Sequence, residues 1–170
     1  MHQLLLLRHA KSSWDDPKLD DRDRPLAPRG RRAVVAMRRA MAEWGLAPDL
    51  VLVSPARRTM QTLELLEPWD ETPLTDHVES LYLATPAEMM GLLHNVAETV
   101  RSVLLIGHNP GLHEFAVTLL GSAQSTETAR QLVEKYPTCA LAEFMIPGPW
   151  LHLRPGGAQL MRFVTPRAIA

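Results

Sequence analysis

Three short runs of apolar residues stand out along the chain, at 4–7, 50–53 and 103–106. Each run has the length of a strand, and none shows the alternation of apolar and polar residues that is typical of a strand with one face in water. The runs therefore predict three central strands of a sheet that is covered on both faces.

The segments between these runs carry helical patterns. Residues 28–44 place their apolar residues on one face and most of their arginines elsewhere, which predicts an amphipathic helix. Ser54 is the expected N-cap of a second helix, with Pro55 at its first position. Thr85 begins the sequence Thr-Pro-Ala-Glu, which predicts a capping box, and Asn109 is the expected N-cap of the helix after that.

The remaining pattern completes the fold class. A polar helix is expected near 126–135, followed by strands at 140–146 and 158–164 that pair antiparallel across a turn rich in proline and glycine. Strands that alternate with helices predict an α/β fold with three layers, α/β/α, and a mostly parallel central sheet that carries an antiparallel edge. We expect residues 1–170 to form a single domain, because this is an ordinary domain length.

Charge and composition limit the partners. The 18 Lys and Arg residues and 19 Asp and Glu residues give a net charge of −1, so no overall field favours nucleic acid or an anionic membrane. The single cysteine, Cys139, cannot form an internal disulfide and is expected to be a small buried side chain. The apolar run at 4–7 is too short for a signal peptide or a membrane span. We therefore expect a cytoplasmic protein, and the sequence leaves its oligomeric state open.

A polar loop after the first strand holds a cluster of acidic residues. The cluster consists of Asp15, Asp16, Asp20, Asp21 and Asp23. Its spacing differs from that of a calcium-binding loop. We therefore expect these carboxylates to be solvated.

Polar residues at the ends of the three central strands carry the candidate chemistry. Arg8 and His9 follow the first strand, Ser54 to Arg58 the second, and His108 with Asn109 the third. Ligands of open α/β sheets bind at the carboxyl ends of the strands, next to helix N-termini. With no carboxylate expected nearby, this site would be strongly cationic, and arginines suit the oxygens of a phosphoryl group.

The nucleophile of such a site has four candidates, His9, Ser12, Ser54 and His108. A neutral imidazole attacks phosphorus near pH 7 without a base to activate it, unlike a serine hydroxyl, so one histidine can attack while the other donates a hydrogen bond. Metal-assisted transfer needs carboxylates, and none of the three strand ends supplies one. We therefore expect neither a metal nor a cofactor.

The segments 8–10, 54–62 and 107–111 together resemble the histidine phosphatase superfamily, the phosphoglycerate-mutase-like group. Further similarity at 11–15, at 23–26 with 29–30, and at 160–167 indicates a resemblance to the short SixA-type phosphohistidine phosphatases. The resemblance implies a phosphoglycerate-mutase-like fold. Ala10 replaces the glycine that most of the superfamily has at this position, a change that is common among SixA-like chains.

The resemblance also implies roles for individual residues. His9 would be the nucleophile that is transiently phosphorylated, and Arg8, Arg58 and His108 would form the rest of the phosphate pocket. Supporting phosphate contacts would come from two further residues, Ser12 and Asn109.

The general acid of such a site is a further residue to identify. Phosphomonoesterases of the superfamily carry a carboxylate on an inserted lid, for which this chain has little room. The best candidate is Glu79, and the alternative is that Glu79 is a surface carboxylate. A phosphoester leaves as an alkoxide that needs a proton, whereas phosphohistidine leaves as imidazole, a better leaving group.

The leading hypothesis is therefore a metal-independent phosphatase that hydrolyses phosphohistidine through phospho-His9. Its partner would be a phosphorylated protein or a small phosphorylated substrate, with no nucleic acid and no membrane. The alternatives are a small-molecule phosphomonoesterase that uses Glu79 as its acid and a non-catalytic phosphate-binding module.

Overall fold

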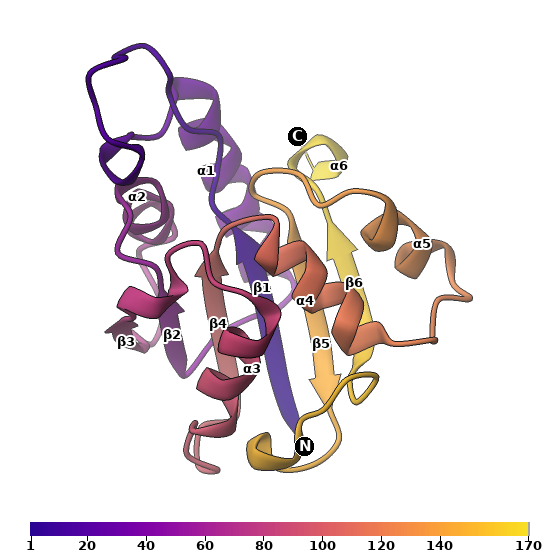
Figure 1. Ribbon diagram of the computed structural model, residues 1–170. Coiled ribbons are helices and arrows are strands. Elements are labelled where there is room, and N and C mark those ends of the chain that lie inside the picture. Colours follow the sequence, from indigo (N-terminus) through magenta and orange to yellow (C-terminus); the bar gives the residue numbers. More distant parts are fainter. Residues whose placement is uncertain (170) are drawn as a thin grey trace.

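The computed structural model describes residues 1–169, in which six strands form one sheet in the order β3-β2-β4-β1-β5-β6 (Figure 1). The strands are β1 (His2–Arg8), β2 (Leu50–Val53), β3 (Leu74–His77), β4 (Ser102–Gly107), β5 (Leu141–Ile146) and β6 (Gln159–Val164). Strands β3, β2, β4 and β1 run parallel, while β5 is antiparallel to both β1 and β6. The predicted α/β class with a mostly parallel sheet and an antiparallel edge is confirmed.

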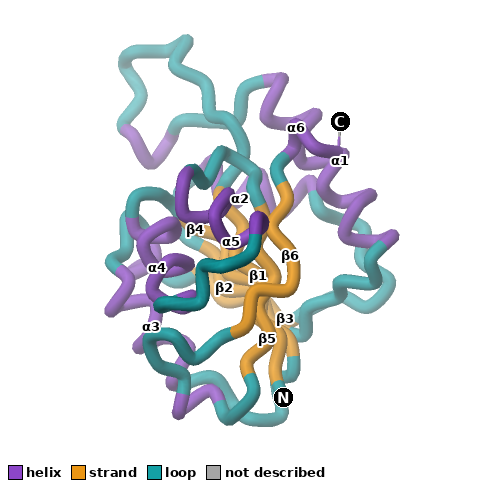
Figure 2. The backbone as a smooth tube through the Cα atoms, turned by 90° about the vertical axis from the view of Figure 1, so that its right-hand side faces the viewer, coloured by secondary structure: helices purple, strands orange, loops and turns teal. Residues whose placement is uncertain are grey.

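Helices cover both faces of the sheet, as Figure 2 shows with the sheet seen from its side. The helices are α1 (Pro28–Glu43), α2 (Arg57–Leu65), α3 (Pro86–His94), α4 (Gly111–Leu120), α5 (Glu127–Glu134) and α6 (Pro166–Ile169), with short 3-10 turns η1 (Asp21–Asp23), η2 (Glu79–Leu81) and η3 (Trp150–His152). No helix among residues 1–169 is long and apolar enough to cross a membrane.

Alternate residues of β1 build the two cores. Leu4 and Leu6 pack with the apolar residues of α3, α4 and α5, while Leu5 and Leu7 pack with those of α1 and α2. All four side chains are completely buried. The unbroken apolar run in the sequence is thus the signature of a strand with a helix layer on each face.

The helix starts differ in part from the predictions. Thr85 forms the predicted capping box at α3. The prediction for α2 is wrong, because the helix begins at Arg57 after Ala56, and Ser54 instead turns its hydroxyl toward a histidine. Helix α4 begins one residue later than predicted, with Pro110 at its N-cap position, although the side chain of Asn109 still accepts a hydrogen bond from the first turn.

The connections after β1 and β4 create the place for a site. These strands are neighbours in the sheet, and the chain leaves β1 toward α1 on one face but leaves β4 toward α4 on the other (Figure 1). The loops therefore part above the carboxyl ends of the two strands, which is where open α/β sheets bind ligands.

Candidate active site

A hollow of about 390 Å³ lies at the carboxyl ends of β1 and β4, and we call it the phosphate pocket. Arg8, His9, Arg58 and His108 all line it, together with Ser12 and Asn109. Its other lining residues are Lys11, Trp14, Asp21, Arg24, Leu83 and Thr138. The structure therefore brings together six of the seven site residues predicted from the sequence.

His9 lies directly after β1 and is 7% exposed. Its Nδ1 lies 2.7 Å from the carbonyl oxygen of Ala10. Because a carbonyl only accepts hydrogen bonds, Nδ1 must carry the proton, and Nε2 keeps its lone pair. Burial, aided by the charges of Arg58 and Arg8, lowers the pKa of His9 to about 4, so the ring is neutral near pH 7.

The backbone behind His9 is held by an unusual residue. Cys139 adopts a left-handed conformation with φ of 61°, and its N–H lies within hydrogen-bond distance of the carbonyl oxygens of both Arg8 and His9. The thiol is buried, which raises its pKa to about 12. The predicted burial of Cys139 is confirmed, and its backbone fastens the end of β1.

His108 follows β4 and faces the same pocket. The ring centroids of His9 and His108 are 5.3 Å apart, and Nε2 of His108 lies 2.7 Å from the hydroxyl oxygen of Ser54. Burial, together with His9 and Arg58 nearby, lowers the pKa of His108 to about 3. Both histidines are thus neutral near pH 7.

Arg8 and Arg58 contribute two of the positive charges of the pocket. The Nη1 group of Arg8 donates to the carbonyl oxygen of Tyr136 at 3.0 Å, and burial followed by the charge of Arg58 lowers the pKa of Arg8. Within the described chain, Nε of Arg8, Nε of Arg58 and Nδ1 of His108 are buried and have no hydrogen-bond partner. Unpaired buried polar atoms are costly, so an oxyanion bound among these side chains would stabilise the site.

Asp21 also lines this pocket, so the prediction of a site without a carboxylate is wrong. Its carboxylate accepts hydrogen bonds from Arg58 at 2.9 Å and from Arg24 at 3.0 Å, and a third from the hydroxyl of Tyr82. Although burial raises it, these hydrogen bonds lower the pKa of Asp21 well below its usual range. The side chain of Asp21 is 44% exposed, as the prediction of a solvated loop requires, but it also binds the arginine predicted to hold phosphate, which was not predicted.

Arg24 is a further pocket residue that the residue patterns did not single out. It is buried, and its guanidinium stacks on the ring of Trp14 with 3.5 Å to the ring centroid. It also donates to the hydroxyl oxygen of Ser12 at 2.8 Å. The predicted phosphate contact Ser12 is therefore next to a third guanidinium. The signals for it in the sequence were the polar loop after β1 and the family resemblance of the segment that contains Arg24.

Asn109 has both ends of its side chain bonded to the protein backbone. Its amide group donates to the carbonyl of Tyr136 at 2.9 Å, and its carbonyl oxygen accepts from the N–H of His113 at 3.2 Å. The carbonyl of Tyr136 thus accepts from both Arg8 and Asn109. These contacts tie the start of α4 to the arginine of β1.

Glu79 is the predicted site residue that does not line the phosphate pocket. It is exposed in η2, and both of its carboxylate oxygens accept hydrogen bonds from Arg22. These hydrogen bonds lower the pKa of Glu79, which keeps the carboxyl group ionised at neutral pH.

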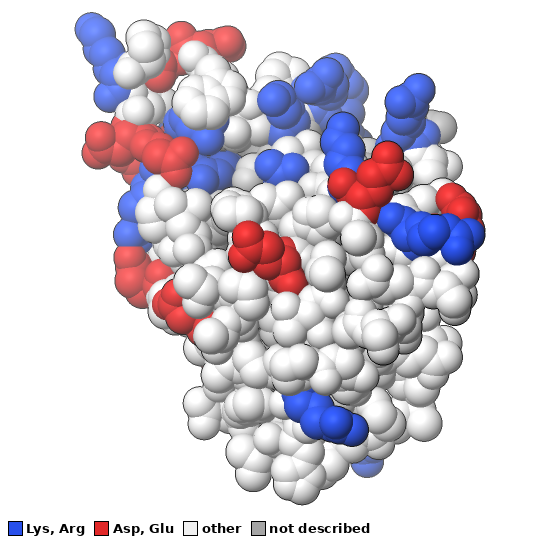
Figure 3. Space-filling model, turned by 45° about the vertical axis from the view of Figure 1, so that its right-hand side comes forward, with Lys and Arg blue, Asp and Glu red and all other residues white. Residues whose placement is uncertain are grey.

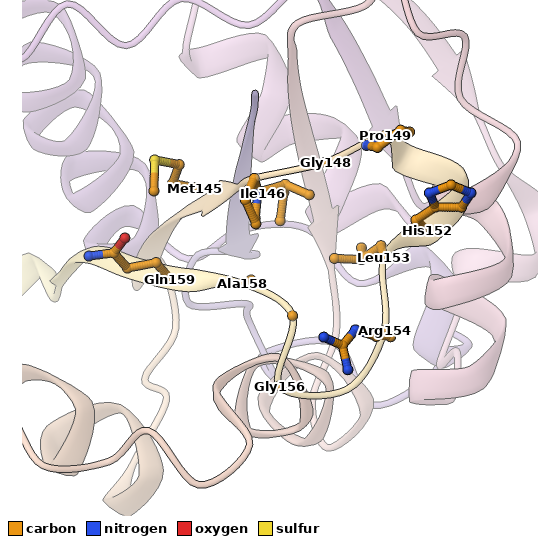
Figure 4. A pocket seen from close by; sticks show the side chains of 12 residues that line it. Met145, Ile146, Gly148, Pro149, His152, Leu153, Arg154, Gly156, Ala158 and Gln159 are labelled. Atoms are coloured by element: carbon orange, nitrogen blue, oxygen red, sulfur yellow. The ribbon is translucent and has the colours of Figure 1, made fainter.

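A second hollow, of about 480 Å³, lies at the opposite end of the sheet, in the turn between β5 and β6 (Figure 4). His152 and Arg154 are the titratable side chains of its lining, which otherwise consists of apolar residues, glycines and Gln159. The catalytic residue types gather in the phosphate pocket instead.

Comparisons with known proteins identify the family of the chain. The family model of the histidine phosphatase superfamily (branch 1) matches residues 4–78. An uncharacterized protein of Mycobacterium tuberculosis is 35% identical over 162 residues, which cover 95% of this chain and 100% of the relative. An uncharacterized protein of Mycobacterium leprae is 32% identical over 164 residues, with 95% and 100% covered.

Solved structures show the same fold. The candidate phosphohistidine phosphatase SixA of Nakamurella multipartitia superposes with a TM-score of 0.85 at 26% identity, covering 97% of this chain and 96% of that one. Its counterpart from Agrobacterium tumefaciens gives a TM-score of 0.82 at 26% identity, with 96% and 97% covered. The architecture is therefore the phosphoglycerate-mutase-like fold that the sequence resemblance implied.

Proposed function

Because this chain belongs to the histidine phosphatase superfamily, we propose that it is a phosphatase that hydrolyses phosphohistidine through a transient phosphoryl group on His9. The observation that carries the proposal is the state of the His9 ring. Its Nδ1 proton is donated to the carbonyl of Ala10, which leaves a neutral ring with a free Nε2 lone pair in a pocket lined by cations. This is the state that a nucleophile for phosphorus requires.

The reaction would take two steps. In the first, Nε2 of His9 attacks the phosphorus atom as the P–N bond of the substrate breaks; the departing ring nitrogen keeps the electron pair and takes a proton from water, which leaves hydroxide. In the second, water attacks phospho-His9, the new P–N bond breaks, and its electron pair returns to Nε2. One proton of this water stays on the inorganic phosphate and the other neutralises the hydroxide, so the neutral His9 ring is restored.

Arg8, Arg58 and His108 would stabilise the phosphoryl oxygens in both steps. Charge on these oxygens spreads during transfer, and donors already fixed in place stabilise it without reorganising. Asp21 would act as a positioning residue, because its bonds to Arg58 and Arg24 fix where both guanidinium groups lie. Ser12 and Asn109 line the same pocket and would support the phosphate contacts.

We expect a preference for an N–P bond because the candidate general acid, Glu79, is poorly placed to donate a proton. Glu79 lies outside the pocket lining and is ionised by its pairing with Arg22, so it is a poor proton donor there. An alkoxide leaving group requires such a donor more than an imidazole does. The two SixA proteins described above, which carry the name phosphohistidine phosphatase, lend further support.

A direct test compares the release of inorganic phosphate from a phosphohistidine peptide and a phosphoserine peptide. We expect faster release from phosphohistidine, and we expect Glu79→Gln to change either rate by less than about twofold, since an exposed ion pair contributes little. The matched control is Glu64→Gln, which neutralises a different exposed carboxylate, one that lies on α2. Faster hydrolysis of phosphoserine that is lost in Glu79→Gln would instead support a phosphomonoesterase with Glu79 as its acid.

The pH dependence of kcat/KM reports the pKa of His9. Protonation removes the Nε2 lone pair, so activity should fall as the pH drops through the pKa of about 4 and remain high at pH 6. Arg24→Gln removes one of the positive charges that lower this pKa, so the acid limb of the pH profile should move to higher pH. The rates are measured against the uncatalysed loss of phosphohistidine at each pH. An acid limb at the ordinary histidine value of 6.5 would contradict the proposed state of His9.

A further inference from the structure

A third hollow, with a volume of about 370 Å³, opens beside the phosphate pocket. We call it the cationic hollow, because its charged lining residues are Lys11, Arg29, Lys135 and Arg167. Lys11 and Thr138 line both hollows, so the two adjoin each other. A substrate protein whose phosphoryl group lies in the phosphate pocket would therefore have the cationic hollow beside it.

The four cations of this hollow come from separate parts of the chain. Lys11 follows β1, Arg29 lies in the first turn of α1, Lys135 follows α5, and Arg167 lies in α6. None of the four has a side-chain nitrogen within 4.0 Å of a carboxylate oxygen of residues 1–169. No Asp or Glu belongs to the lining, and Figure 3 shows Lys and Arg side chains gathered along this upper edge of the molecule.

The start of α1 adds to the positive potential. The first turn of this helix contains Arg29 and no acidic residue, although the partial positive charge of a helix N-terminus favours acidic side chains there. Gly30 brings the same turn against the active-site loop, since a Cβ atom at this position would lie 2.2 Å from the carbonyl oxygen of Lys11. Fold stability alone does not explain this placement of charge, whereas an anionic ligand would.

The opposite side of the phosphate pocket carries the contrasting charge. The loop there contains Asp15, Asp16, Asp20 and Asp23, all exposed, together with Lys18 and Arg22, and both red and blue side chains are visible at the upper left of Figure 3. Aspartates outnumber basic residues in this loop, so its net charge is negative, whereas the charged lining of the cationic hollow is entirely basic. Such a pattern favours one orientation of a charged partner and penalises the reverse one.

The cationic hollow also has apolar parts. Ala33, Pro137 and Pro166 contribute to its lining. A compact inorganic ion makes no use of such surface, whereas a glutamate or aspartate side chain on a polypeptide offers a carboxylate together with methylene groups. We propose that the cationic hollow binds an acidic side chain of the substrate protein, next to its phosphohistidine; this rests on the proposed function.

The experiment measures kcat/KM for a set of phosphohistidine peptides. Each peptide differs from the others at a single position flanking the phosphohistidine, and each flanking position is tested in turn with Glu, Gln and Lys. We expect the best Glu peptide to exceed its Lys counterpart by about tenfold, and the ratio to decrease with added salt. In the double variant Lys135→Glu with Arg167→Glu, the ratio should fall to one or below. Arg39→Glu reverses an exposed charge on α1 outside both hollows and should leave the ratio unchanged.

Two further measurements make the outcomes distinct. Thermal unfolding establishes that the variants fold, and turnover of free phosphohistidine reports the chemical step without a flanking residue. Equal kcat/KM for the Glu, Gln and Lys peptides, or an unchanged ratio in the double variant, would overturn the acidic-partner proposal while leaving the phosphatase intact. A gain only when the neighbouring residue is phosphoserine would show that the hollow takes a second phosphate, which also overturns it. Absence of turnover on every substrate would remove the proposed function itself.

Discussion

Replacement of His9 by alanine is expected to lower kcat on phosphohistidine peptide by at least about 10⁴-fold, because loss of a nucleophile removes the covalent route. The ring is buried and makes one hydrogen bond, to its own neighbour Ala10, so the variant should still fold. The measurement is the initial rate of phosphate release with wild type and variant at equal concentration. His77→Ala, an exposed histidine of β3, is the control and should keep full activity.

The intermediate gives a second reading of the same prediction. Wild-type protein mixed with radiolabelled phosphohistidine peptide and quenched in alkali should retain label on the chain, since phosphohistidine is stable in base and labile in acid. His9→Ala should retain none. Undiminished phosphate release by the variant, or label that survives acid, would exclude His9 as the nucleophile.

Arg58→Ala should lower kcat/KM by about 10²- to 10³-fold, the size of effect seen when one donor to a developing oxyanion is lost. The loss has two parts, because the variant also leaves the carboxylate of Asp21 without its 2.9 Å partner beside the bound phosphoryl group. The carboxylate of Asp21 and the phosphoryl group are both negative and repel each other, and this repulsion adds to the effect of losing the donor.

The second part can be separated by a double variant. Adding Asp21→Asn to Arg58→Ala removes the repelling charge and should recover about fivefold in kcat/KM, the coupling expected for two residues in contact. Alone, Asp21→Asn should reduce activity, since Arg58 loses its charged side-chain partner and keeps only the hydrogen bond to the backbone carbonyl of Asp21. Asp76→Asn, an exposed aspartate of β3, is the matched control. Strictly additive effects would show that Asp21 does not act through Arg58.

Local signals explain which elements the sequence predicts. The three central strands are continuous apolar runs and the capping box of α3 is contained within four residues, so neighbours in the chain determine both. Strand β3 was missed, because all four of its residues are exposed and three of them are polar or charged, with no alternation of apolar and polar positions. Its place in the sheet comes from hydrogen bonds to β2, which single-chain patterns do not reveal.

The same distinction applies to the residues of the site. Arg8, His9, Arg58 and His108 were predicted together, since the carboxyl ends of parallel strands must meet at one edge of a sheet. Asp21, Arg24 and Tyr82 were not identified as pocket residues. They lie in the connections that follow β1 and β3, and their hydrogen bonds depend on how those connections fold back over the sheet: Asp21 binds Arg58, Arg24 binds Ser12, and Tyr82 binds Asp21. Sequence patterns therefore locate the nucleophile better than they locate the residues that orient the arginines.

Cys139 gives this active site a probe of its own motion. Its thiol is buried beneath the segment that its backbone N–H ties to Arg8 and His9, and its raised pKa keeps it protonated and unreactive in the closed state. A thiol reagent reaches it only in molecules where this segment has opened. The labelling rate of Cys139 consequently measures the free energy of local opening directly behind the nucleophile, with no introduced reporter and no change to the sequence.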